Sequence, residues 1–136
     1  FWGRSAFITP LDGRNLNRVF PGNATGTFSD VLAHRLMEDI VGPADALIDL
    51  HSGDVFESLT DHTGRYTADD AEIDTVTAAM CEAFGLSFAV SYPRPARPGS
   101  LTGNATLAGK AAMFVEVGGN ALASDDDVFH VFQGLI

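Results

Sequence analysis

Three short apolar runs, separated by stretches with helical spacing, constrain the fold of this chain most. Each run has the length and the bounding turn residues of a buried strand, and they cover residues 46–50, 86–92 and 111–117. The expected helices cover about residues 29–41, 68–84 and 125–133. Because strands that alternate with helices normally stack in layers, we expect an α/β fold with a mostly parallel or mixed central sheet flanked by helices.

The remaining segments are rich in proline, glycine or polar residues and are expected to be loops. They cover residues 9–27, 54–69 and 93–99. Apolar residues inside the first segment favour an ordered loop, and long loops in compact domains are usually functional. The second segment is expected to lie over the carboxyl edge of the sheet. A further strand-like segment opens the chain and runs to about Ile8.

Composition excludes several classes of partner. At 136 residues and 46% hydrophobic content, the chain can bury the core of one domain. Its 8 basic and 18 acidic residues give a net charge of −10, which argues against nucleic acid or an anionic membrane as a partner. No apolar stretch approaches the length of a membrane span and no signal peptide is recognisable, so a soluble, cytoplasmic protein is expected. Cys81 is the single cysteine, which excludes an internal disulfide and favours a buried thiol.

His51 follows directly on the apolar run 46–50, where a buried strand should end at the small-residue turn Ser52-Gly53. Ligands and metals collect at the carboxyl ends of strands in α/β sheets, so an imidazole placed there is a candidate metal ligand. The alternative is a structural histidine that only makes hydrogen bonds. His51 alone does not decide between them.

A second candidate segment, 12–22, brings two arginines and two asparagines within five positions. The four residues are Arg14, Asn15, Asn17 and Arg18. A guanidinium beside amide donors is suited to gripping a carboxylate at two points. The alternative is an ordinary turn with solvated arginines, since asparagine is a favourable turn residue.

Glu116 lies inside the apolar run 111–117, where an ionised carboxylate is costly unless it is paired or near a metal. Burial there would raise its pKa toward the range of a general base. The alternative is a glutamate at a strand end that simply reaches solvent.

Together, these segments resemble the succinylglutamate desuccinylase/aspartoacylase family of zinc-dependent amidohydrolases, which share the zinc carboxypeptidase fold. The matching segments are Asp12–Gly22, Asp49–Gly53 and Val115–Gly119, in the family's order. The resemblance implies a hydrolase that cleaves the amide bond of a small N-acyl amino acid, with an acetyl or succinyl acyl group. Within the family, the sequence looks like the subgroup that acts on N-acetyl-diaminobutyrate.

The same resemblance implies roles for individual residues. His51 would be the last of three protein ligands of a catalytic Zn²⁺, and Glu116 would be the general base. Asn17 and Arg18 would hold the carboxylate of the substrate.

Two further arginines are rivals for one role. Arg4 resembles the arginine that polarises the scissile carbonyl, and Arg14 competes for that position or joins in substrate binding. Asn15 stands where the family often has an aspartate that orients a zinc ligand, and it supplies no charge.

One element of the family pattern is absent from the sequence. The family takes its first two zinc ligands from a His-x-x-Glu motif, and neither His34, His62 nor His130 has that spacing. A catalytic zinc normally needs three protein ligands. We therefore expect residues 1–136 to be a single, partial catalytic domain that lacks its N-terminal part and is by itself inactive.

Two alternative functions and one consequence for assembly accompany this expectation. A zinc carboxypeptidase acting on peptides has the same fold and ligand set. A non-catalytic fragment without the first two metal ligands is the rival outside the enzymes. Apolar edges exposed by missing sheet partners should favour self-association into a homo-oligomer.

Overall fold

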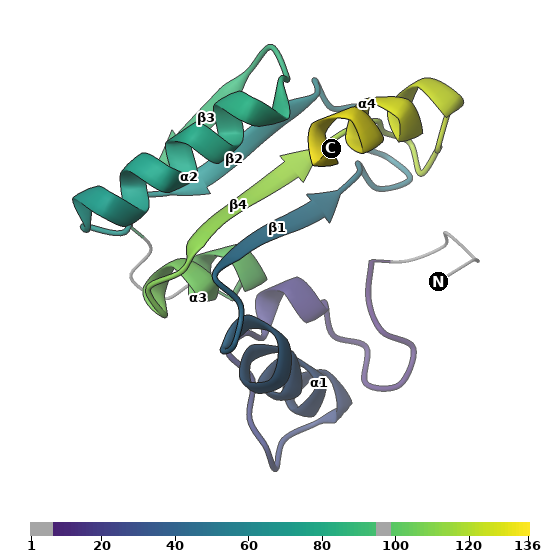
Figure 1. The fold of residues 1–136 in the computed structure, drawn as a ribbon. Helices are drawn as coiled ribbons and strands as arrows, with labels where there is room; N and C mark the ends of the chain where they lie inside the picture. Colours follow the sequence, from purple (N-terminus) through teal and green to yellow (C-terminus); the bar gives the residue numbers. More distant parts are fainter. Residues whose placement is uncertain (1–6, 95–98) are drawn as a thin grey trace.

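The computed structural model describes residues 7–94 and 99–136, which form a four-stranded sheet with helices on both faces (Figure 1). The strands are β1 (Ala46–His51), β2 (His62–Tyr66), β3 (Ala89–Tyr92) and β4 (Ala111–Glu116). The helices are the 3-10 helix η1 (Leu16–Arg18), α1 (Phe28–Leu36), the π-helix η2 (Met37–Val41), α2 (Ala71–Phe84), α3 (Leu101–Leu107) and α4 (Asp125–Leu135).

The sheet is mixed, in the order β1-β4-β2-β3. β1 runs parallel to β4, β2 runs antiparallel to β4, and β3 runs parallel to β2. The expectation of a mostly parallel or mixed sheet flanked by helices is therefore confirmed. Because β1 and β4 are parallel neighbours, their carboxyl ends meet at one edge of the sheet.

Side chains alternate between the two faces of a strand, so each face has its own core. One face, which we call the α2 face, packs Met113 and Val115 against Cys81 and Phe84 of α2. The opposite face, which we call the α3 face, packs Ala112 against α3 and η2. Cys81 is a buried free thiol, as predicted.

The strand predictions for 46–50 and 111–117 are confirmed within a residue, whereas the strand expected at 86–92 begins only at Ala89. The helix expected at 29–41 is split into α1 and a π-helical turn. The α2 helix begins after Asp70, whose carboxylate accepts hydrogen bonds from two backbone N–H groups of the first turn, and ends at Gly85 in the left-handed conformation. At the opening of the chain, Phe7 and Ile8 form a bend and not a strand, and residues 1–6 lie outside the described part.

Two elements differ from the sequence expectation. The segment 54–69 was expected to be a loop, yet it contains β2. Its sequence, His-Thr-Gly-Arg-Tyr, lacks apolar alternation, and it pairs with β4 because Gly64 leaves room for the Phe114 ring. α3 was also not expected, and its residues 102–106 are all buried.

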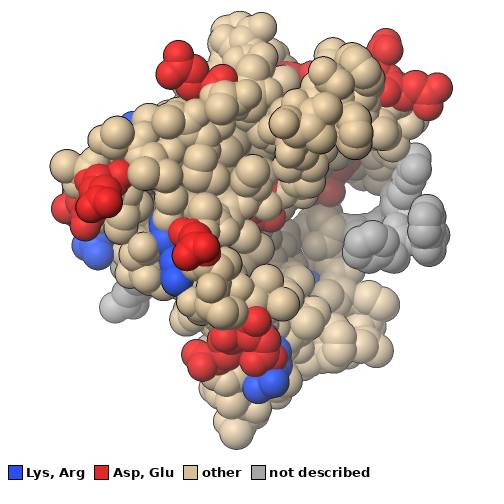
Figure 2. Space-filling model, in the orientation of Figure 1, with Lys and Arg blue, Asp and Glu red and all other residues tan. Residues whose placement is uncertain are grey.

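The surface matches the acidic composition. On the face shown in Figure 2, the basic side chains are few and lie beside acidic ones. Within the described residues, no helix is long and apolar enough to cross a membrane.

Candidate functional site

His51 and Glu116 lie side by side at the carboxyl ends of β1 and β4. They are direct partners in the parallel register, and both side chains belong to the α3 face of the sheet. Asp49 lies two residues before His51 on the same face. His51 and Glu116, which lie 65 positions apart in the sequence, are therefore neighbours in the fold.

Asp49 fixes the ring of His51. Its Oδ2 lies 3.1 Å from Nε2 of His51 and also accepts a hydrogen bond of 3.0 Å from the hydroxyl of Thr102 on α3. Because a carboxylate only accepts, Nε2 carries the hydrogen, and Nδ1 of the neutral ring keeps its lone pair. This hydrogen bond raises the pKa of His51 above its ordinary value, although partial burial of the ring lowers it.

Asn17 reaches the same place from η1. The side chain of Asn15 accepts a 2.8 Å hydrogen bond from the Asn17 N–H, and Oδ1 of Asn17 accepts one of 2.8 Å from the N–H of Leu101. The second bond directs the amide nitrogen of Asn17 toward His51, where it lies 3.5 Å from Nε2. Nε2 of His51 already donates its hydrogen to Asp49, so it cannot accept one from Asn17. The N–H groups of the Asn17 amide therefore remain available for another acceptor.

Arg18 is exposed beside these residues. Its Nη1 donates a 2.8 Å hydrogen bond to the carbonyl of Asn17, and its charge lowers the pKa of His51, which places the guanidinium within electrostatic range of the ring. Gly99 packs tightly on the backbone of Arg18, since a β-carbon there would lie 2.6 Å from the Arg18 carbonyl oxygen. The segment that carries Asn17 and Arg18 is therefore docked against the start of α3.

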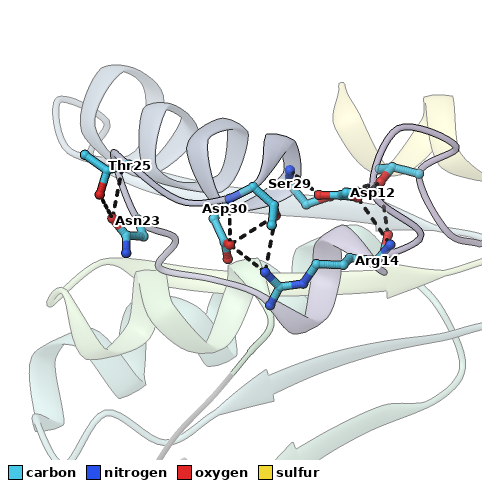
Figure 3. A network of polar contacts seen from close by, with 8 residues as sticks. Asp12, Arg14, Asn23, Thr25, Ser29 and Asp30 are labelled. Carbon is cyan, nitrogen blue, oxygen red and sulfur yellow. Dashed lines mark hydrogen bonds and ion pairs between the residues drawn. The ribbon is translucent and has the colours of Figure 1, made fainter.

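Arg14 lies elsewhere. Its Nη1 forms an ion pair of 2.5 Å with Asp30 and contacts the hydroxyl of Thr27, at the first turn of α1 (Figure 3). Nearby, Asp12 accepts hydrogen bonds from Thr9 and from the N–H and hydroxyl of Ser29. The structure thus brings His51, Glu116, Asn17 and Arg18 together and uses Arg14 to hold the beginning of α1. Arg4 lies outside the described residues.

Glu116 has the environment expected of a general base. Burial raises its pKa most, and a positive charge on His51 or His62, when either ring is protonated, opposes this effect. The carboxylates of Glu57 and Asp49 raise the pKa further. A raised pKa makes the carboxylate a stronger proton acceptor than a solvated glutamate.

Two loops close the edge of the sheet next to this pair. The N–H of Ala121 donates to the carbonyl of Gly53 at 3.2 Å, and the N–H of Asn120 donates to that of Glu57. A β-carbon on Gly53 would lie 2.8 Å from the Glu57 carbonyl, so this close approach requires glycine. Beyond the turn after His51 lies a mostly apolar hollow of about 580 Å³, lined in part by Val55, Phe56 and Leu122.

The described residues do not by themselves form a metal site. No group of three histidine, cysteine, aspartate or glutamate side chains in residues 7–94 and 99–136 is close enough to hold a metal ion. His51 fits one ligand position, because a carboxylate that accepts from one ring nitrogen leaves the other free for a metal. Glu116 and Asp49 do not complete the set.

His62 is a site residue that the sequence did not reveal. It is the first residue of β2 and the direct partner of Glu116 in the antiparallel register. His51 is the partner of Glu116 on the other side, on β1. Its position depends on the pairing of β2 with β4, and no spacing in the sequence signals that pairing.

The comparisons with known proteins agree with this geometry. The sequence model of the succinylglutamate desuccinylase/aspartoacylase catalytic domain matches residues 6–134, so the chain belongs to this family. The resemblance seen in segments 12–22, 49–53 and 115–119 is thereby confirmed.

The alignments with individual relatives include most of this chain but less than half of the length of each relative. The N-alpha-acetyl-L-2,4-diaminobutyric acid deacetylase of Halomonas elongata is 33% identical over 82 residues, which are 60% of this chain and 24% of that protein. The crystal structure of a succinylglutamate desuccinylase from Silicibacter sp. TM1040 is similar with a TM-score of 0.89 and 25% identity, covering 98% of this chain and 41% of that one. A succinylglutamate desuccinylase/aspartoacylase from Rhodobacter sphaeroides has a TM-score of 0.85 and 29% identity, covering 98% of this chain and 38% of that one.

Proposed function

We propose that this catalytic domain belongs to a hydrolase that cleaves the amide bond of N-acyl amino acids. The observation that carries the proposal is the convergence of His51, Glu116, Asn17 and Arg18 at one edge of the sheet, from three segments far apart in the sequence. The family of the chain supports it. The Halomonas elongata relative favours N-acetyl-diaminobutyrate as the first substrate to test.

Glu116 is the proposed general base. Its carboxylate takes a proton from the attacking water as the oxygen bonds to the acyl carbon, and it returns the proton to the nitrogen as the carbon–nitrogen bond breaks. The products are a carboxylic acid and an amino acid. Its raised pKa, caused mainly by burial, suits both halves of this transfer.

Asn17 and Arg18 are the proposed carboxylate-binding pair. The amide nitrogen of Asn17 faces the site because its oxygen is held by the N–H of Leu101. Arg18 adds a positive charge beside it, and charge-assisted hydrogen bonds to a carboxylate are among the stronger polar contacts in proteins. They would anchor the α-carboxylate and thereby orient the amide toward Glu116.

Zinc remains part of the proposal. His51 would contribute one ligand through Nδ1, with Asp49 holding the hydrogen on Nε2. The other ligands would come from residues other than those described. The chemistry that a bound zinc ion supplies is polarisation of the scissile carbonyl and acidification of water.

The central experiment is Glu116→Gln in the full-length enzyme, with Glu82→Gln on the exposed side of α2 as the matched control. The panel contains N-acetyl, N-succinyl and N-formyl amino acids, including N-acetyl-diaminobutyrate, together with a short peptide. We expect kcat to fall by about 10²–10⁴-fold in Glu116→Gln, with bound zinc unchanged near one per chain, because general bases contribute about that much. Full activity of the variant would remove Glu116 as the base, and preference for the peptide would favour a carboxypeptidase.

The binding pair is tested by Arg18→Ala, with the exposed Arg35→Ala of α1 as the matched control. We expect kcat/KM for a carboxylate substrate to fall about 10- to 100-fold, because hydrogen bonds to charged groups contribute ~1.5–3 kcal/mol. For an analogue with a neutral amide in place of the carboxylate, kcat/KM of Arg18→Ala should stay close to that of the parent. Equal losses on both substrates would show that Arg18 has a structural role.

A further inference from the structure

His62 stands directly beside the proposed base. The antiparallel register pairs it with Glu116, and residues opposite each other in such a pair have β-carbons about 4.5–5.5 Å apart on the same face. His51 is the partner of Glu116 on the other side. The carboxylate is therefore flanked by two imidazoles, one on β1 and one on β2.

Two contacts hold the His62 ring in place. Its Nδ1 lies 2.9 Å from the carbonyl oxygen of Thr60, and the ring meets the ring of Phe114 edge-on, at a centroid distance of 6.0 Å and an angle of 87°. Phe114 is itself held, because its ring lies against Gly64. The orientation of the imidazole is therefore set by the backbone and by the central strand.

These contacts leave one ring atom available. A carbonyl oxygen only accepts hydrogen bonds, so Nδ1 of His62 carries a hydrogen. Within the described part of the chain, Nε2 makes no hydrogen bond. It lies on the far side of the ring from Thr60 and, when the ring is protonated at both nitrogens, can donate a hydrogen bond to a carboxyl oxygen.

The electrostatics of Glu116 support a coupling between the two groups. The charge of a protonated His62 lowers the pKa of Glu116 and opposes the effect of burial. The carboxylates of Glu57 and Asp49 act in the opposite direction and raise the pKa of Glu116.

We propose that His62 is a positioning residue for Glu116: its Nε2, which has no hydrogen-bond partner among residues 7–94 and 99–136, is the group that holds the carboxyl of the base in the reacting enzyme. The inference rests on the proposed role of Glu116. When both ring nitrogens carry a hydrogen, Nε2 donates to one carboxyl oxygen of Glu116 whether that carboxyl is ionised or protonated. The contact therefore persists while the other carboxyl oxygen takes the proton from water and passes it to the leaving nitrogen. His62 itself bonds to no atom of the substrate.

Two substitutions separate this role from a structural one. In His62→Asn, the amide nitrogen takes the position of Nδ1 and keeps the bond to the Thr60 carbonyl, but no atom replaces Nε2. In His62→Gln, the amide reaches the position of Nε2 but does not replace Nδ1. His34→Asn on α1 is the matched control.

In the full-length enzyme, we expect His62→Asn to lower kcat by about 10- to 100-fold, by analogy with residues that orient metal ligands, whose substitution costs about that much. KM should stay within about twofold and the Tm close to that of the parent, because the Thr60 contact remains. His62→Gln should recover more activity than His62→Asn. In a Glu116→Gln background, His62→Asn should have no further effect, since it acts through Glu116.

The outcomes distinguish the inference from the proposed function. Full activity of His62→Asn, with Glu116→Gln inactive, overturns the role of His62 and leaves the proposed function intact. A rise in KM with unchanged kcat, or a loss of kcat that tracks a loss of Tm in both variants, overturns it as well. An active Glu116→Gln enzyme removes the proposed function and, with it, the role of His62.

Discussion

The close approach of the Phe114 ring to Gly64 gives a sharp test of how the α3 face of the sheet is built. A β-carbon at Gly64 would lie 2.0 Å from Cζ of Phe114 and 2.5 Å from Cε1 and Cε2. Carbon atoms in contact normally lie ~3.5–4.0 Å apart. Alanine at this position must therefore push the ring outward.

The ring has little room to move. The rings of Tyr66, Tyr92 and His62 lie around it at centroid distances of 6.4, 6.2 and 6.0 Å. Overpacking a core costs ~1–3 kcal/mol, and an overlap this large belongs at the upper end of that range. Part of this loss is offset, because alanine restricts the unfolded chain more than glycine does and thereby stabilises the fold by ~0.5–1 kcal/mol. We expect Gly64→Ala to lower the free energy of unfolding by about 2 kcal/mol.

Urea denaturation followed by circular dichroism measures this change. With an m-value of about 2 kcal/mol/M, the midpoint should fall by about 1 M while m stays constant. Gly109→Ala is the control, because a β-carbon there meets nothing within 4 Å and only the φ of +78° is strained. Left-handed backbone costs ~1–2 kcal/mol for a residue with a β-carbon. Gly64 does not lie in that region, so Gly109→Ala shows backbone strain alone, and only the loss in Gly64→Ala should depend on the Phe114 side chain.

The double variant Gly64→Ala/Phe114→Leu provides the second arm. A smaller, more flexible side chain should relieve the overlap, so the double variant should be less destabilised than the sum of the two single variants. The reasoning is refuted if Gly64→Ala is as stable as the parent within ~0.5 kcal/mol, or if the two substitutions are simply additive.

Two further predictions concern the hydrogen bonds that hold the site and the start of α1. Thr102→Val removes the hydroxyl that donates to Asp49, and we expect a loss of about 1.5–3 kcal/mol in urea denaturation, whereas Thr102→Ser should retain most of the stability; equal stability of the two variants would contradict this. The hydroxyl of Thr9, above all, and the groups of Ser29 hold the pKa of Asp12 well below its usual range. Because the folded pKa is lower than the unfolded one, this stabilisation is complete above the unfolded pKa of about 3.9 and is lost as the pH falls below it. The parent should therefore lose stability more steeply than Asp12→Asn as the pH falls below about 4, and parallel stability curves in that range would show that Asp12 is not the group responsible.

Local chemistry in the sequence was enough to predict the main elements and most of the candidate site. β1 and β4 are apolar runs bounded by turn residues, and α2 carries its own stop signal in Gly85. His51 was predicted from its position at the end of a buried strand, and Glu116 from its place inside an apolar run, where an ionised carboxylate is costly unless it is paired. These features depend on a few neighbouring residues, which is why they can be read from one sequence.

The tertiary structure decided what depends on pairing between distant segments. β2 has no apolar alternation and becomes a strand only because β4 offers it a partner and Phe114 fits over Gly64. The same pairing brings His62 beside Glu116, which lies 54 positions further along the chain. The ion pair of Arg14 with Asp30 of α1 likewise depends on the folded structure, and it places Arg14 away from the candidate site. Sequence spacing predicts which residues share a strand or a helix. Which residues meet across strands is set by register and packing, and these exist only once the chain has folded.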